Sequence, residues 1–199
     1  MFDTGGVAAG GAQGTFKVQV AATPSAASSN PQDPTFGGGS TVGTSFVTEA
    51  ILTESSGKML VIGHKGDATP GAAQGVIEQL KTDGSVDTTF GSKGTITTAA
   101  GANEEYFAAA WQDAKHFVVV GSARGDFLVR RFNLNGTLDA TFGTKGTVTA
   151  DFGTTTDAGR AVAIGSGGNI VVYRAGGYGQ LGYGWYHQRQ DIRPVAFRK

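Results

Sequence analysis

The residues best suited to chemistry are few in this chain and stand far apart. There are three histidines, His64, His116 and His187, and no cysteine. No two histidines have a zinc-ligand spacing such as His-x-x-x-His, and without cysteine there is no thiolate ligand. The Gly-x-Ser-x-Gly of many hydrolases and the P-loop of nucleotide-binding proteins are both missing. The sequence therefore predicts no catalytic residue, no metal site and no cofactor, and hence a protein that is not an enzyme.

Three weaker signals point the same way. His116 opens an apolar run, which favours a structural role, although a Ser-His-Asp triad assembled by the fold stays open as an alternative. Gly177–Gly182 fits the dinucleotide pattern G-x-G-x-x-G, but a helix-like continuation and a distant acidic residue are lacking, so a loop is favoured. The aspartates occur one or two per repeat beside turns, instead of at the alternate positions of a calcium loop.

The best candidate for a binding site lies near the C-terminus, where aromatic residues alternate with basic ones. Its candidate residues are Tyr183, Trp185, Tyr186 and Arg189. Aromatic and arginine side chains are the groups that a sugar, a peptide or another subunit would contact. The simpler interpretation, which we favour, is a last strand followed by a basic end.

The overall composition excludes several classes of protein. The 16 basic and 16 acidic residues cancel, so neither a nucleic acid nor an anionic membrane surface is the expected partner. The N-terminus has no basic region followed by an apolar run, so no signal peptide is visible, and no apolar segment is long enough for membrane insertion. The 33 glycines among 199 residues indicate many tight turns.

The elements that would position any site come from an internal repeat. Asp33-Pro34-Thr35-Phe36-Gly37 recurs from Asp87 and again from Asp139, that is, 54 and then 52 residues further on. Asp-x-Thr is typical of a turn in which the carboxylate accepts the backbone N–H two residues later. The phenylalanine then points inward as a plug between neighbouring units, and we call these five residues the plug turn.

Between plug turns the pattern is strand, turn, strand. In the second unit we expect strands at 94–98, 106–111, 116–121 and 127–133, with corresponding apolar runs at 59–62 and 170–173. The best place for a helix, 72–80, is interrupted by Gly75 and too short to stand alone. The sequence therefore predicts an all-β protein of tandem antiparallel four-stranded units.

These segments resemble the delta-60 repeat, a family found in bacterial surface and secreted proteins. The resemblance runs over roughly residues 33–175 and is carried by Gly57–Gly63, Gly125–Asn133 and Asn135–Gly143. It implies propeller-like β-structure but no activity, because the family has no general catalytic signature. It also implies a location outside the cell, on a cell surface. The Gly- and Thr-rich, cysteine-free composition and the lack of a visible signal peptide suit a virus particle as well.

We divide the chain into an N-terminal arm with one strand (1–32), three repeats (33–86, 87–138 and a degenerate 139–182) and an aromatic, basic tail (183–199). Since a propeller needs roughly four to eight blades, three units predict closure by oligomerisation or by the N-terminal strand at 14–20. The alternative is an open sandwich or solenoid whose exposed edges meet a partner. The expected function is a non-catalytic binding or structural module for adhesion or assembly, such as a phage fibre or decoration protein. Its expected partner is another copy or an assembly protein. The alternatives are a carbohydrate-binding lectin, with a glycan as partner, and a propeller hydrolase.

Overall fold

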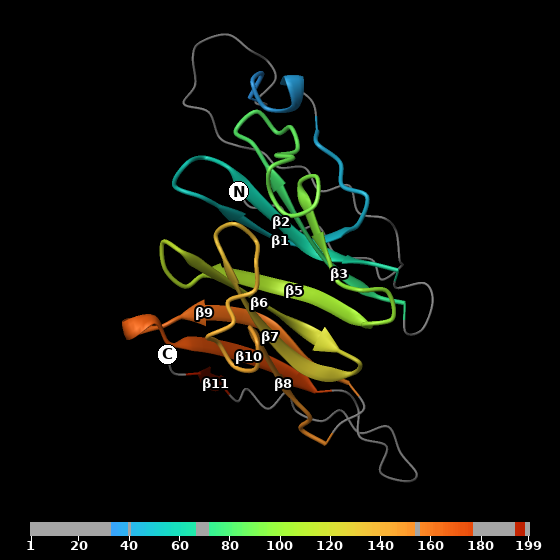
Figure 1. Cartoon of the computed structure of the whole chain (residues 1–199), viewed down its shortest axis with the longest axis vertical. Helices are drawn as coiled ribbons and strands as arrows, with labels where there is room; N and C mark the ends of the chain where they lie inside the picture. The colour runs from blue at the N-terminus through green and yellow to red at the C-terminus, as the bar shows by residue number, and fades with distance from the viewer. Residues whose placement is uncertain (1–32, 40, 67–71, 154–155, 177–193, 198–199) are drawn as a thin grey trace, which may run out of the picture.

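The computed structural model describes residues 33–39, 41–66, 72–153, 156–176 and 194–197, and in them the chain is all-β. Three antiparallel sheets follow one another along the molecule (Figure 1). Sheet 1 contains β1 (Val47–Thr53), β2 (Met59–Lys65), β3 (Gln74–Leu80) and β4 (Thr95–Thr97). Sheet 2 contains β5 (Glu104–Trp111), β6 (His116–Ala123), β7 (Asp126–Asn133) and β8 (Thr147–Ala150). Sheet 3 contains β9 (Asp157–Ile164), β10 (Ile170–Gly176) and β11 (Pro194–Phe197).

This architecture confirms the predicted fold class of four-stranded antiparallel units. The stretch at 72–80, the nearest the sequence comes to a helix, contains β3. Within the described residues the only helical turns are two short 3-10 segments, Gly37–Gly39 and Ser166–Gly168. None of these described segments offers a helix long and apolar enough to cross a membrane.

The sheets are out of phase with the sequence repeat. The segment at 95–97, which the repeat groups with the second unit, pairs with β3 and completes sheet 1. In the same way β8, which follows the third plug turn, pairs with β7 and completes sheet 2. The second and third plug turns thus each lie inside a sheet, between its third and fourth strands.

The core lies between the sheets, in three apolar clusters. One cluster joins sheets 1 and 2, and a second joins sheets 2 and 3. The third covers the far side of sheet 1, where Phe36 and Phe46 pack with residues of β2 and β3. Alternate residues of β6 pack against the two neighbouring sheets: Val119 faces sheet 1, whereas Val118 faces sheet 3. This explains why the second strand of a unit reads as a continuous apolar run.

The three plug phenylalanines are buried, as predicted. Phe36, Phe90 and Phe142 are 5%, 3% and 6% exposed, and each belongs to one of the three clusters. A glycine near the end of the same repeat lies against two of the rings. A methyl group on Gly136 would stand 2.8 Å from the Phe90 ring, and one on Gly84 would stand 3.1 Å from the Phe36 ring. Both glycines also have a positive φ. The turn conformation and the close approach to the ring are therefore two separate reasons why these positions require glycine.

At each contact between neighbouring sheets a large side chain packs on a glycine. The earlier sheet supplies the glycine at the first contact and the large side chain at the second. At the first joint Tyr106 of sheet 2 packs on Gly75 of sheet 1, where an added methyl group would lie 2.5 Å from the ring. At the second joint the large residue is Phe127 of sheet 2 and the small one is Gly159 of sheet 3. Because each joint depends on its own pair, the sheets are not interchangeable although their strands repeat.

The first strand of every sheet carries an irregularity at an equivalent place. The register shifts between Thr48 and Ala50, between Tyr106 and Ala108, and opposite Tyr173 and Arg174. Opposite the first two bulges stand Gly63 and Gly121, where any side chain would overlap the backbone oxygen across the strand pair. These two bulges therefore require glycine in the second strand. The bulges in β5 and β9 turn Phe107 and Arg160 out of the regular alternation.

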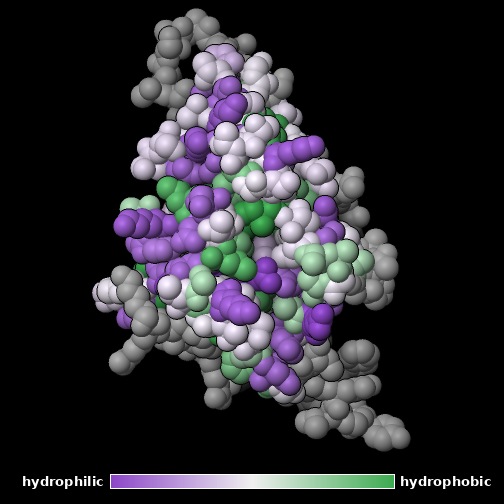
Figure 2. Space-filling view, in the orientation of Figure 1, coloured by the Kyte–Doolittle hydropathy of each residue, from purple (hydrophilic) through white to green (hydrophobic). Residues whose placement is uncertain are grey.

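Figure 2 shows hydrophilic and hydrophobic residues interspersed over the face drawn there. The predicted N-terminal strand at 14–20 and the rest of the arm at 1–32 lie outside the described residues.

Candidate functional site

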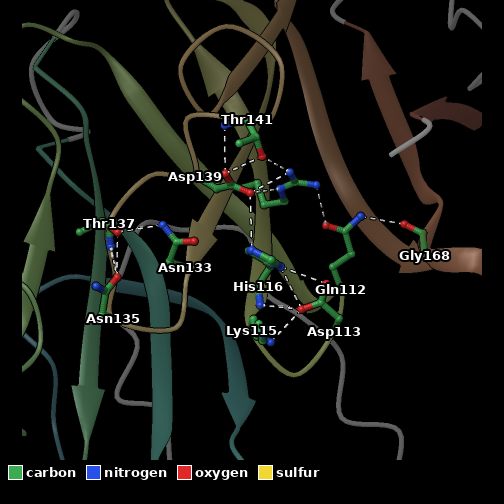
Figure 3. Close-up of polar contacts among 11 residues, drawn as sticks. Gln112, Asp113, Lys115, His116, Asn133, Asn135, Thr137, Asp139, Thr141 and Gly168 are labelled. Atoms are coloured by element: carbon green, nitrogen blue, oxygen red, sulfur yellow. Dashed lines mark hydrogen bonds and ion pairs between the residues drawn. The ribbon is translucent and has the colours of Figure 1, made fainter.

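The largest polar network surrounds the plug turn of sheet 2 (Figure 3). The Asp139 carboxylate accepts hydrogen bonds from the backbone N–H and the hydroxyl of Thr141, at 3.0 and 2.7 Å. Its other oxygen pairs with the Arg131 guanidinium at 2.7 Å, and Arg131 also lies over the Phe142 ring at 4.8 Å. The bonds from Thr141 hold the pKa of Asp139 below its usual value, which keeps the carboxylate charged.

Two further contacts extend this network. Arg131 donates to the Gln112 side-chain oxygen at 3.3 Å, and the Gln112 amide donates to the Gly168 carbonyl oxygen at 2.7 Å. Gly168 lies in the 3-10 turn that joins β9 and β10 of sheet 3, so a polar chain leads from the plug turn of sheet 2 to the next sheet. The network therefore ties neighbouring blades together.

His116 lies between two carboxylates of the same network. Its Nδ1 is 2.9 Å from Asp113 Oδ1, and its Nε2 is 3.6 Å from Asp139 Oδ2. An Asp-His pair is the beginning of a catalytic triad, but here the far nitrogen faces a carboxylate that Arg131 already holds. The arrangement supports the predicted structural role of His116.

Sheet 1 contains the same network with different residues, which identifies what the network needs. Asp87 accepts from Thr89 at 3.1 and 2.7 Å, as Asp139 does from Thr141. Lys58 stands where sheet 2 has His116, at the start of the second strand, and pairs with Asp87 at 2.6 Å. The side-chain contact of Gln112 with Arg131 is replaced by a 2.5 Å hydrogen bond that Gln79 donates to Glu54. The shared requirement is a cation beside the plug-turn aspartate, supplied from different positions.

Acid should weaken the fold through these aspartates. Lys58, followed by Thr89, holds the pKa of Asp87 well below its usual value of 3.8. The folded protein therefore binds fewer protons than the unfolded chain, and the stability that Asp87 contributes is present above about pH 4 and lost as the pH falls further. We expect Asp87→Asn to be less stable than the wild type at pH 7, with a difference that shrinks toward pH 2.5. Thermal unfolding across this range, with Lys58→Met reproducing part of the effect, measures it; parallel pH curves for Asp87→Asn and wild type would contradict it.

A second cluster lies near the bulges of the first strands. The Arg160 guanidinium lies over the Phe107 ring at 3.8 Å, and the His64 ring meets the same ring edge-on at 5.7 Å. His64 is buried, with its Nε2 4.0 Å from Glu105 Oε1, and Ser122 donates to the other Glu105 oxygen at 3.2 Å. Arg160 is exposed, so this cluster presents a cation on an aromatic platform.

The predicted binding residues Tyr183, Trp185, Tyr186 and Arg189 lie outside the described residues, as do His187 and the glycine run at 177–182. Strand β11 pairs with β10 in sheet 3. Three or more potential metal ligands do not come together anywhere in the described part of the chain.

Sequence reasoning missed the partners of the plug-turn aspartates. Arg131 comes from β7 and Gln112 directly follows β5, and their contacts depend on strand pairing that no local spacing reveals. One signal was present: Lys58 and His116 hold equivalent places where the second strand begins, and both are basic.

Buried plug turns, repeated polar joints and successive four-stranded sheets define an array of antiparallel blades of the propeller type. In the described residues the sheets do not close into a ring. Residues 117–142, which cover nearly all of β6, all of β7 and most of the third plug turn, match a family model described as a β-propeller domain of unknown function (DUF5122). No curated protein matches the chain. The match supports a propeller-like repeat.

Proposed function

We propose that this chain is a non-catalytic β-repeat module of the delta-60 type that acts by assembly or adhesion on a cell surface or a virus particle. The polar networks support a non-catalytic role, because in each of the two four-stranded sheets the network holds the aspartate of that sheet's plug turn. Their aspartates are held by neighbouring cations and hydroxyl groups, so their charge stabilises the joints between blades.

The observation that carries the proposal is the open face of sheet 3. Ala161 and Ala163 of β9 are exposed, and Val171 and Tyr173 of β10 are half-buried. Their equivalents in sheet 2 face sheet 3: Val118 and Val120 are fully buried, and Ala108 and Ala110 pack against the same cluster. The open face thus repeats an apolar surface that a further blade covers elsewhere in the molecule, and such surfaces mark interaction sites.

The proposal predicts a homo-oligomer, which light scattering coupled to size exclusion, or native mass spectrometry, measures directly. We expect a mass at least twice that of the chain at micromolar concentration, because an uncovered blade face is a favourable place for association. A single-chain mass at every concentration contradicts self-association. Binding of that monomer to a glycan array would then favour a lectin that uses the exposed Arg160 and its Phe107 platform.

A further inference from the structure

The two ends of the blade array carry complementary parts of one blade. Sheet 3 has a first, second and third strand, but among the described residues it has neither a plug turn nor a fourth strand. Asp33–Gly43 has the opposite character, because it contains a plug turn and the residues that follow one, without three strands of its own before it in the described chain. The parts that the last blade lacks, a plug turn and a fourth strand, therefore have their sequence counterparts at the start of the array.

Sequence equivalence shows that residues 41–43 correspond to a fourth strand. Counted from the plug phenylalanines, Val42 occupies the position of Ile96 in β4 and of Val148 in β8. All three are half-buried, and each packs against a different one of the three apolar clusters, at the same place relative to the sheet that follows it. In β4 and β8 these residues pair with a third strand, whereas residues 41–43 are in no strand.

The segment already sits on sheet 1 in the way that a preceding blade would. Phe36 packs with Met59 and Val61, and Gly84 lies against its ring as Gly136 lies against that of Phe90. The Gly37 N–H donates to the Asp83 carbonyl oxygen at 2.7 Å, which fastens the segment to sheet 1. Sheet 1 and sheet 3 lie at opposite ends of the array with sheet 2 between them (Figure 1), so this segment cannot reach sheet 3 of its own chain.

We propose that a second copy of the chain completes the last blade: Asp33–Gly43 of one copy supplies the plug and the fourth strand of sheet 3 in the other. This rests on the proposed assembly function and names its partner. The joint is head-to-tail, and two copies joined at both ends would hold six blades, within the roughly four to eight that close a propeller. The new interface would cover Ala161, Ala163, Val171 and Tyr173 as sheet 3 covers their equivalents in sheet 2.

The register of the joint follows from sheet 1, where Glu78 stands opposite Thr95 and Ile77 opposite Ile96. Transferred through the pairing of β10 with β11, this places Val195 opposite Thr41 and Pro194 opposite Val42 of the second copy. Pro194 has no N–H, so the joint makes one backbone hydrogen bond fewer than its counterpart in sheet 1. Apolar burial by Phe36 and Val42 must therefore contribute much of its stability.

Engineered cysteines test this register, because the natural chain has none. Glu78 and Thr95 form a pair without mutual backbone hydrogen bonds, the closer type of antiparallel pair, whose spacing suits a disulfide. We expect a Thr41→Cys chain mixed with a Val195→Cys chain to yield a disulfide-linked dimer under mild oxidation. Ala140→Cys, on an exposed plug-turn residue, is the control partner for Val195→Cys and should yield none.

A second variant tests the face itself. Ala163→Arg adds a charged side chain at an exposed position, so each chain should fold with an unchanged melting temperature when measured at a dilution that separates the copies, while the mass at micromolar concentration falls by half or more. Ala140→Arg is the matched control and should leave the mass unchanged. An oligomer that neither cross-links nor responds to Ala163→Arg overturns this joint and leaves the assembly function standing, whereas a monomer without cross-links overturns both. Cross-linking only within a chain carrying both cysteines overturns the second copy as the occupant.

Discussion

Replacing Phe90 by alanine is expected to destabilise the protein by about 3–5 kcal/mol, the usual cost of removing a buried aromatic side chain. Phe90 is 3% exposed and joins residues of both sheets in the cluster that contains Leu60, Tyr106 and Phe132. The space is hard to refill, because the turn at Gly136 and the side chain of Ile96 close over the ring. The free energy of unfolding in urea measures the effect.

Leu134→Ala provides the control, because Leu134 is 43% exposed and should cost less than about 1 kcal/mol. A loss of stability this small for Phe90→Ala would mean that the plug does not hold the sheets together. Phe142→Ala should resemble Phe90→Ala, although Arg131 covers that ring and would keep some of its contacts with the turn.

Arg130→Met is expected to destabilise the protein by about 3–5 kcal/mol at neutral pH, because it leaves a carboxylate buried without its cation. Arg130 pairs with Glu104 at 2.7 Å and donates to the Tyr106 hydroxyl at 3.3 Å. The second Glu104 oxygen is buried and has no hydrogen-bond partner in the structure. Tyr106 is fully buried, which raises the pKa of its hydroxyl and keeps it neutral, so Arg130 provides the compensating charge.

The pH dependence separates this mechanism from a loss of packing. Burial raises the pKa of Glu104, against the opposing effect of Arg130, and removing Arg130 should raise the pKa further. A raised pKa means that the folded state binds more protons than the unfolded state, so the variant regains stability as the pH falls below neutral toward the usual range of a glutamate. Unfolding in urea at several pH values measures it, and a cost that does not change with pH would contradict the ionic explanation.

Arg160→Met is the matched control for Arg130→Met. The same substitution removes a guanidinium that is exposed and rests on the Phe107 ring. Exposed cation–π contacts contribute about 0.5–1 kcal/mol, so the effect should be small.

The sequence by itself determined the repeated elements of this protein. Asp-x-Thr-Phe-Gly specifies its turn through bonds between neighbours, as in Asp87 and Thr89, so its geometry follows from local spacing. The apolar runs at 59–62 and 116–121 likewise identify strands covered on both faces, and the burial of the plug phenylalanines was predictable from their place in the repeat.

Only the tertiary structure decided how the strands divide into sheets and which residues meet. The repeat is equally compatible with a sheet that begins or ends at the plug turn, and the choice depends on pairing such as that of β4 with β3. The pairs Tyr106 with Gly75 and Arg131 with Asp139 join distant strands, so no local pattern encodes them. The open face of sheet 3 is also a property of the array, because whether an apolar strand is covered depends on its neighbour in space, and the strand's own residues do not specify that neighbour.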